Sequence, residues 1–229
     1  MRDRNSIVNS WYTENYHKIN ASAQVDSIFS NYFHKSIEKD IGIKLNFKEY
    51  SILEIGGGDG EHVAFVSSGW TAYTCTDIKR PSKEVLMKLK SSGIDFQIQD
   101  AQALSFPENK FDRVISTCVL HHLIYPELAL LEMRRVAKPG GRISIALPTD
   151  PGITYRFLRL ITTVRNARRF ELNSELEIVH AFEHRNHYLG IIPLICEVFK
   201  NDLIRKSNRP FGLFGYHLNA FTVFQITKI

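Results

Sequence analysis

The chain has 229 residues, of which 44% are hydrophobic and 23% are charged, and this length favours one domain with additions over two complete domains. Such a composition excludes a largely disordered, a collagen-like or a disulfide-stapled protein. The net charge of +5 suits acidic partners without indicating a nucleic acid.

The cysteines and the apolar segments indicate where the protein works. Three cysteines, Cys75, Cys118 and Cys196, lie far apart and without metal-ligand spacing, so we expect neither a disulfide framework nor a metal site. The N-terminus has no apolar core long enough for a signal peptide, and the uncharged run at 210–227 contains residues that break a membrane helix. We therefore expect a soluble, cytoplasmic protein.

Residues 1–47 are expected to form an N-terminal helical cap, because their aromatic residues follow one another at loosely helical spacing. Five strand-like segments then alternate with helical stretches. The strands are expected at 51–55, 71–76, 94–99, 111–117 and 142–147, and the helices at 60–68, 82–92 and 126–138. Strands that alternate with helices form right-handed βαβ units and build a doubly wound, mostly parallel sheet.

The rhythm changes after residue 148. Residues 149–188 read as a helical insertion after the fifth strand, and a helix at 189–200 is followed by strands at 202–207 and 217–227. The strand at 94–99 alternates between apolar and polar residues, as at a sheet edge, whereas 114–116 and 143–147 read as more central. We expect one domain, with its core at 48–148 and a closing segment at 189–229.

The segment LEIGGGDG, residues 53–60, lies where the first strand turns into the first helix. Gly56, Gly58 and Gly60 leave room for a ligand to approach the backbone, although a tight turn also favours glycine for steric reasons alone. The fingerprint G-x-G-x-x-G/A and the phosphate loop G-x-x-x-x-G-K-[ST] are both absent. Glu54, two residues before Gly56, would repel a pyrophosphate and favour a cation.

The segment EIGGGDG resembles the first motif of class I S-adenosylmethionine-dependent methyltransferases. The resemblance covers residues 48–148 at the level of motifs, with TCTDIK after the second strand, FQIQDAQAL after the third and RRVAKPGG before the fifth. It implies a Rossmann-like seven-stranded sheet and S-adenosylmethionine as cofactor. By this resemblance, the cofactor-binding residues are Glu54, Gly56, Gly58, Gly60, Asp77, Ile78, Asp100, Ala101 and Thr117.

A sulfonium is already a good leaving group, so the enzyme mainly has to position the acceptor, which can supply ~7–11 kcal/mol. An alcohol acceptor would also need a base, and a histidine can serve near neutral pH. The candidates are His121, after the fourth strand, and His184, which lies with His180 and His187 near the end of the insertion. Each could instead make a structural hydrogen bond.

The insertion carries five arginines and no acidic residue between residues 152 and 170. Arg156 and Arg159 are candidates to bind a phosphate or carboxylate of the acceptor, or an anionic lipid surface, although a solvated basic face is the simpler interpretation. Tyr12 and Tyr16 of the cap are candidates to close over the bound molecules. No zinc-finger spacing or RNA-binding aromatic signature supports a nucleic-acid substrate.

The sequence therefore predicts a methyltransferase for a small or medium acceptor, at oxygen rather than nitrogen, with an acidic glycan precursor or a lipid-linked molecule as plausible acceptors. Two alternatives remain open. One is a lipid or quinone methyltransferase at the membrane surface. The other is a regulatory or scaffold protein that binds the cofactor without turnover, because no catalytic residue in the chain is diagnostic.

Overall fold

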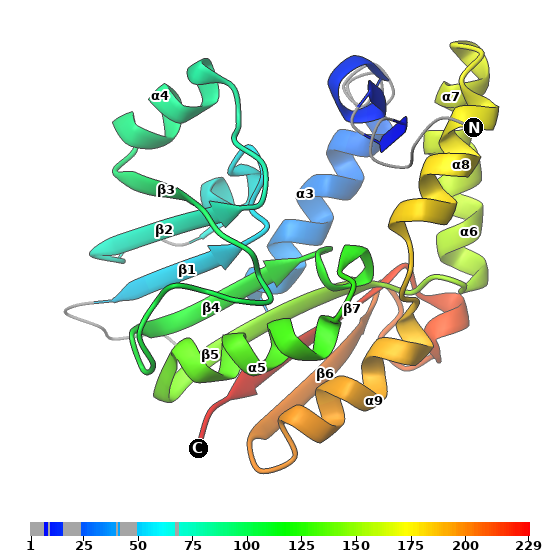
Figure 1. Ribbon diagram of the computed structural model, residues 1–229. Coiled ribbons are helices and arrows are strands. Elements are labelled where there is room, and N and C mark those ends of the chain that lie inside the picture. Colours follow the sequence, from blue (N-terminus) through cyan, green and yellow to red (C-terminus); the bar gives the residue numbers. More distant parts are fainter. Residues whose placement is uncertain (1–6, 9, 16–23, 40, 42–49, 67–68) are drawn as a thin grey trace.

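The computed structural model of the chain describes residues 7–8, 10–15, 24–39, 41, 50–66 and 69–229. A seven-stranded sheet with the order β3-β2-β1-β4-β5-β7-β6 runs through the molecule (Figure 1). β1 to β5 pair in parallel, and β7 is antiparallel to both β5 and β6. The strands are β1 Ser51–Ile55, β2 Ala72–Asp77, β3 Ile94–Ile98, β4 Phe111–Thr117, β5 Ala137–Pro148, β6 Leu203–Arg209 and β7 Phe221–Thr227.

This arrangement confirms the expected Rossmann-like, mostly parallel sheet, with β3 at an edge and β4 near the centre. Three elements are markedly shorter than expected. The strand expected at 217–227 begins only at Phe221, because Tyr216–Leu218 form the 3-10 helix η5. The segment after the glycine turn forms only a short 3-10 helix, η2 (Glu61–Phe65), because Val66 already adopts an extended backbone. The helix α5 (Pro126–Val136) stops before Lys138, because Pro139 disfavours helix at the residue before it and Ala137 pairs with Phe111 instead.

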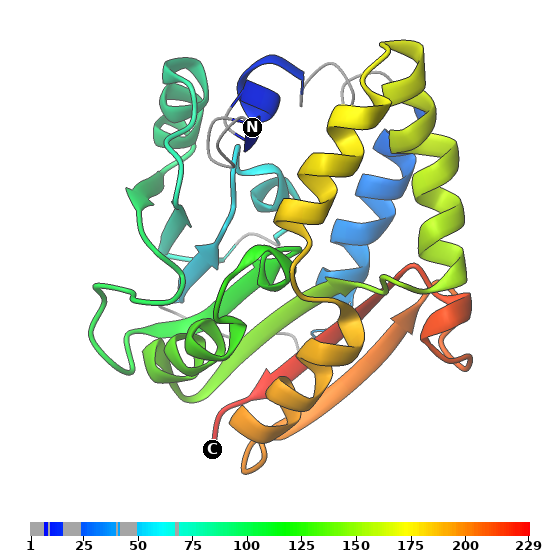
Figure 2. The same cartoon turned by 45° about the vertical axis from the view of Figure 1, so that its right-hand side comes forward.

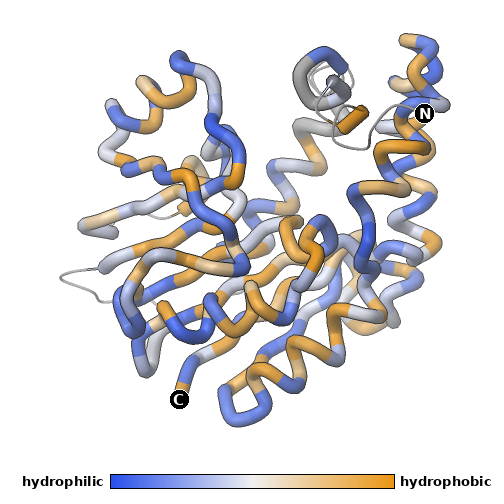
Figure 3. The backbone as a smooth tube through the Cα atoms, in the orientation of Figure 1, coloured by the Kyte–Doolittle hydropathy of each residue, from blue (hydrophilic) through white to orange (hydrophobic). Residues whose placement is uncertain are grey.

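One face of the sheet is covered by α5 and α9 (Tyr188–Val198). Hydrophobic and hydrophilic residues alternate along α5 in Figure 3, as in a helix with one buried side. Side chains from both helices and from β1, β4, β5 and β7 form the largest buried cluster, which includes Leu53, Val114, Leu130, Met133, Ile145, Ile191 and Ile195. This core fixes the positions at which the parallel strands end.

The opposite face is covered by α3 (Gln24–Lys39), whose Phe33 and Ile37 pack against residues of β5 and β7. A charged residue, Arg113 of β4, is buried on this side of the sheet, where it is only 1% exposed. Its guanidinium donates to both carboxylate oxygens of Glu38, at 2.9 and 2.7 Å. Such a bidentate pair satisfies the buried charge, and it joins the N-terminal helix to the middle of the sheet.

Glu38 also binds the element that follows the glycine turn. His62 of η2 donates through Nε2 to Glu38 Oε1 at 2.9 Å. Burial alone would raise the pKa of the Glu38 carboxyl, but the hydrogen bonds from His62 and Arg113 more than offset this effect and lower the pKa. The carboxylate therefore stays ionised and holds α3, η2 and β4 together.

The insertion after β5 is helical, as expected, and we call residues 149–188 the lid. It contains α6 (Ile153–Arg159), a π-helical turn η4 (Leu160–Val164), α7 (Arg165–Arg169) and α8 (Asn173–Glu183). Figures 1 and 2 show the lid as two antiparallel legs, one made of α6 and α7 and the other of α8. Both stand beside α3, at the end of the sheet where the parallel strands stop. Within the described residues, no helix has both the length and the apolar character needed to cross a bilayer.

The Glu38 carboxylate can be tested by its effect on stability. We expect Glu38→Gln to lower the free energy of unfolding by about 3–5 kcal/mol at pH 7, because it leaves the Arg113 charge buried and uncompensated. The matched control is Glu197→Gln, whose pair with Lys200 is solvent-exposed, and it should change stability by less than about 1 kcal/mol. Urea unfolding of the three proteins measures both values.

The same comparison has a pH dependence. The folded-state pKa of Glu38 lies below its ordinary value of 4.5, so the unfolded chain takes up the proton first on acidification. The stabilisation is therefore complete above about pH 4.5 and is lost as the pH falls through the folded-state pKa. A stability difference between wild type and Glu38→Gln that stays constant down to pH 3 would contradict this assignment.

Candidate active site

The turn between β1 and η2 depends on three glycines with left-handed backbone, because φ is +65° at Gly56, +51° at Gly58 and +74° at Gly60. A Cβ at Gly56 would collide with the side chain of Val119, and one at Gly60 would collide with Leu89. At Gly58 a Cβ would meet no atom within 4 Å. The turn is thus packed at both ends and open in the middle.

Asp77 ends β2 beside this open position. Its carboxylate accepts the Gly58 N–H at 3.1 Å and the Lys79 N–H at 2.9 Å. The next residue, Ile78, is 63% exposed. A carboxylate held against the turn, with an exposed apolar side chain next to it, can bind vicinal hydroxyls and cover one face of a base.

Asp100 follows β3 at the same edge of the sheet, because the Gln99 N–H donates to the Asp77 carbonyl at 3.0 Å. The Asp100 carboxylate accepts the Gln102 N–H at 2.9 Å and stays exposed, whereas Ala101 is buried. The structure thus places the two acidic residues predicted from the second and third motifs at neighbouring strand ends.

Glu54 lies under the turn rather than in its opening. Its side chain is only 1% exposed and accepts the Tyr73 hydroxyl at 2.7 Å, and burial raises the pKa of its carboxyl. A Cβ at Gly57 would lie 2.9 Å from Glu54 Cδ. A direct contact of this carboxylate with a cofactor stays a prediction, and its observed partner is a tyrosine of β2.

The carboxyl end of β4 forms the other wall of the site. Thr117 is half-buried there, and the buried Ser116 Oγ has no hydrogen-bond partner among the described residues. Val119 of the following loop packs on Gly56. An unsatisfied hydroxyl, two nearby carboxylates and an open glycine backbone fit a nucleoside with a polar, cationic tail, as S-adenosylmethionine is.

Four histidines gather where the loop after β4 meets the lid. His121 and His122 belong to η3 (Leu120–His122), His180 belongs to α8, and His184 is the residue that caps the C-terminal end of α8. The ring centroids of His121 and His184 are 4.7 Å apart, and those of His180 and His184 are 3.9 Å apart. Both histidines proposed from the sequence therefore lie in one cluster.

The hydrogen bonds of the lid fix this cluster in place. The Asn186 N–H donates to the His121 carbonyl at 3.3 Å, and the Asn186 side chain donates to the Leu123 carbonyl at 2.6 Å. Burial, followed by the neighbouring imidazoles, lowers the pKa of His184 to about 2. Burial is also the main cause that lowers the pKa of His180 to about 4, so both rings are neutral at pH 7.

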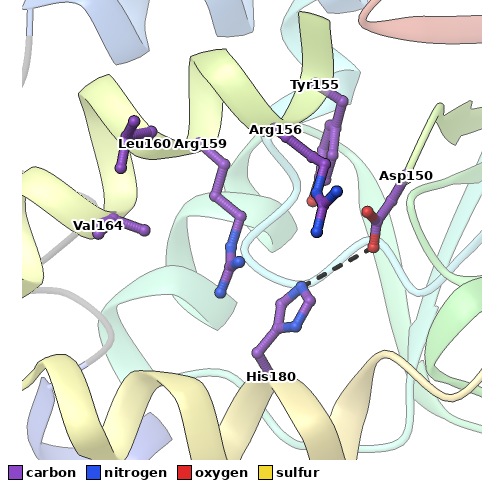
Figure 4. Close-up of a pocket in the computed structure, with 7 residues that line it drawn as sticks. All are labelled: Asp150, Tyr155, Arg156, Arg159, Leu160, Val164 and His180. Atoms are coloured by element: carbon purple, nitrogen blue, oxygen red, sulfur yellow. Dashed lines mark ion pairs between the residues drawn. The ribbon is translucent and has the colours of Figure 1, made fainter. Parts of the chain in front are cut away.

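A cavity of about 350 Å³ adjoins the histidine cluster (Figure 4). Arg156 and Arg159 extend from α6 toward His180 and Asp150, as Figure 4 shows. The cavity is lined by Asp150, Tyr155, Arg156, Arg159, Leu160, Val164 and His180. The two arginines predicted from the sequence therefore share one concave site, which leaves Arg165, Arg168 and Arg169 outside its lining.

The sequence interpretation missed two lining residues and proposed two that cannot be placed here. Asp150 and Tyr155 were not singled out, although Asp150 follows a strand end just as Asp77 and Asp100 do. Tyr12 lies in the π-helical turn η1 (Trp11–Asn15), but its side chain is not among the described ones, and Tyr16 lies outside the described residues.

Comparison with known proteins agrees with this geometry. Residues 53–145 match the family described as "Methyltransferase domain". The ubiquinone/menaquinone biosynthesis C-methyltransferase UbiE of Burkholderia multivorans is 37% identical over 102 residues, which are 42% of this chain and 42% of that protein. The demethylmenaquinone methyltransferase of Renibacterium salmoninarum is 44% identical over 64 residues, 28% of this chain and 27% of that protein. The chain thus matches less than half the length of these curated relatives.

Solved structures share the fold at low sequence identity. The plantazolicin methyltransferase BpumL, in complex with a substrate analogue and SAH (S-adenosylhomocysteine), has a TM-score of 0.68 at 13% identity, over 97% of this chain and 94% of that one. The PH0226 protein of Pyrococcus horikoshii has a TM-score of 0.64 at 15% identity, over 96% and 99% of the two chains. Residues 53–145 therefore resemble a methyltransferase domain, and the whole chain shares its fold with solved methyltransferases, one of which holds SAH.

Proposed function

We propose that the protein transfers a methyl group from S-adenosylmethionine to a small or medium acceptor with an anionic group, bound in the cavity under the lid. One observation carries the proposal: the loop after β4 separates the open glycine turn from the arginine-lined cavity. Val119 of this loop touches the turn, and His121 of the same loop reaches the cluster beside the cavity. Cofactor and acceptor would therefore meet across η3.

The cofactor half uses the residues proposed from the resemblance. Asp77 would bind the ribose hydroxyls, and Ile78 and Ala101 would contact the adenine. Asp100 would accept a hydrogen bond from the adenine amino group. Gly58 and Thr117 would face the methionine part. When bound, S-adenosylmethionine supplies a methyl group on a positively charged sulfur.

The acceptor would bind under the lid, which lies outside the matched residues 53–145. Arg156 and Arg159 offer guanidinium groups that suit a phosphate or a carboxylate. His121 and His184 would orient the acceptor atom, because burial lowers the pKa of both imidazoles too far for either to hold its proton near pH 7. The walls of the cavity would limit the access of water to the methyl group. An oxygen atom on an acidic glycan precursor fits this combination of arginines and histidines. A cytoplasmic location stays a prediction.

A lipid-linked or quinone-type acceptor is the second candidate, and a specific surface favours it. α6 exposes Ile153 (64%) and Phe157 (59%), and the segment between β6 and β7, which contacts α6 through η5 (Tyr216–Leu218), exposes Leu213 (98%) and Phe214 (53%). Apolar side chains next to arginines suit an anionic membrane surface. The similarity to quinone C-methyltransferases points the same way.

The experiment that tests the proposal is release of S-adenosylhomocysteine from S-adenosylmethionine in the presence of acceptor panels. Phosphorylated and carboxylated sugars form one panel, and prenyl-linked sugars and quinols in anionic vesicles form the other. Turnover with the first panel supports the proposal, and turnover only with vesicles supports the second candidate. Cofactor binding without turnover on either panel would contradict both and favour a regulatory role.

Gly58 provides a test of the cofactor half. We expect Gly58→Ala to weaken S-adenosylhomocysteine binding by about tenfold or more, because the added methyl group occupies the open side of the turn. Gly140→Ala is the matched control, since Gly140 also has a left-handed φ of +74° and free space around its Cβ position, but lies near the start of β5. Both variants should lose about 1–2 kcal/mol of stability. Equal affinities by calorimetry would refute the assignment.

His121 and His184 are tested by separating turnover from binding. His121→Ala and His184→Ala should lower kcat by about 10²-fold or more, because each loses a group that acts on the acceptor. Cofactor affinity should stay within about twofold of wild type. His187→Ala is the control, since His187 is exposed and outside the cluster. If both variants turn over at the wild-type rate, neither histidine acts on the acceptor.

Arg156 and Arg159 are tested by the Michaelis constant of the acceptor. The double variant Arg156→Ala, Arg159→Ala should raise KM by about tenfold or more, because each charge-assisted hydrogen bond contributes about 1.5–3 kcal/mol. The control is Arg165→Ala, Arg168→Ala, which removes the same charge from lid residues that do not line the cavity. An unaltered KM in the first variant, or an equal increase in both, would contradict an anion site.

A further inference from the structure

The carboxylate of Asp150 faces two histidines at the C-terminal end of α8, at the wall of the cavity. Asp150 Oδ2 lies 4.0 Å from His180 Nε2 and 3.9 Å from His184 Nδ1. The three side chains can each offer one ligand atom, and these atoms lie within 4.8 Å of one another. The imidazoles are partly stacked, with centroids 3.9 Å apart.

These separations are too long for hydrogen bonds, which need about 2.7–3.2 Å between nitrogen and oxygen. His180 Nε2 is buried and has no hydrogen-bond partner among the described residues. A buried polar atom without a partner usually marks a place for a water or an ion. Zinc bonds of about 2.0–2.2 Å put the ligand atoms of a tetrahedral ion about 3.3–3.6 Å apart, so the Asp150 oxygen and the two histidine nitrogens would each move by a few tenths of an ångström to bind one ion.

The local structure presents the two nitrogens together. His180 lies in the last turn of α8 and His184, four residues later, caps the helix, with its N–H donating to the His180 carbonyl at 2.9 Å. This spacing places both rings on the same side of the chain, as in helical zinc sites with two histidines. The Tyr188 N–H donates to the Asp150 carbonyl at 3.0 Å and ties the end of β5 to the segment that follows α8. The backbone therefore holds the carboxylate opposite the histidines.

We propose that Asp150, His180 and His184 bind a divalent transition-metal ion, such as Zn²⁺. Two nitrogens and one carboxylate oxygen are a common ligand set for zinc and iron(II), and they leave a coordination position free. Asp150 and His180 line the cavity, so that position would face the space where an acceptor would lie (Figure 4). This inference does not depend on methyl transfer.

Two neighbouring features bear on the ligand set. Arg159 and Arg156 line the same cavity, and their positive charges would repel a cation. The negative charge of Asp150, and of an anionic molecule in the cavity, would offset this repulsion. His121, His122 and His184 form a second possible triad, with His121 and His122 Nδ1 also unpartnered among the described residues. We favour the triad with Asp150 because it contains a negative charge and borders the cavity.

The test uses the full chain without a histidine tag, treated with a chelator and titrated with Zn²⁺ by calorimetry and with Co²⁺ by absorption spectroscopy. Wild type should bind about one equivalent with a dissociation constant below about 10 µM. Asp150→Asn, which keeps the shape of the side chain, and His180→Ala should each weaken binding by about tenfold or more. His187→Ala should bind as wild type does, because His187 lies outside the triad.

Three results would overturn the inference. The first is the absence of binding by wild type in this range. The second is equal binding by wild type and His180→Ala. The third is loss of binding in His122→Ala without loss in Asp150→Asn, which would assign the ion to the other triad. Calorimetry with S-adenosylhomocysteine on the same variants shows that they are folded, and it separates a failure of the metal site from a failure of the proposed function.

Discussion

The glycine turn at residues 56–60 is the constraint on which the rest of the site depends, because three other parts of the fold contact it closely. The loop after β4 packs on Gly56, α4 (Lys83–Ser91) packs on Gly60, and the end of β2 accepts the Gly58 N–H. A side chain at either end of the turn would push these elements apart. The absence of a Cβ at Gly56 and Gly60 thus aligns the proposed cofactor site with the loop after β4, which leads to the proposed acceptor site.

A buried network of Arg113, Glu38 and His62 connects the segment after the turn to α3, on the sheet face opposite α5 and α9. Arg113 is enclosed in the protein and needs a counter-charge, which Glu38 provides from α3. Glu38 also binds His62 in the element after the turn. One carboxylate therefore links α3, the centre of the sheet and the segment that follows the glycine turn. The cap therefore stabilises the site even though its own described side chains do not line the cavity.

The sequence predicted those features that depend on local patterns. Strand and helix alternation and the glycine turn are visible in periodicity and spacing, whereas the two acidic residues at strand ends, Asp77 and Asp100, were predicted from the family resemblance. The pair of Glu38 and Arg113 is not, because its members lie 75 residues apart and meet only when α3 packs on the sheet. Asp150 was missed for the same reason, since its partners, His180 and His184, come from the C-terminal end of α8. Glu54 was interpreted through its charge, whereas the structure gives its carboxylate a buried tyrosine partner.

A crystal structure of the protein with S-adenosylhomocysteine tests the central claim most directly. The account predicts the ribose hydroxyls within hydrogen-bond distance of the Asp77 carboxylate, and the amino-acid part running past Gly58 toward Ser116 and η3. A nucleoside bound anywhere else, or bound here with its sulfur directed away from the loop after β4, would contradict the account.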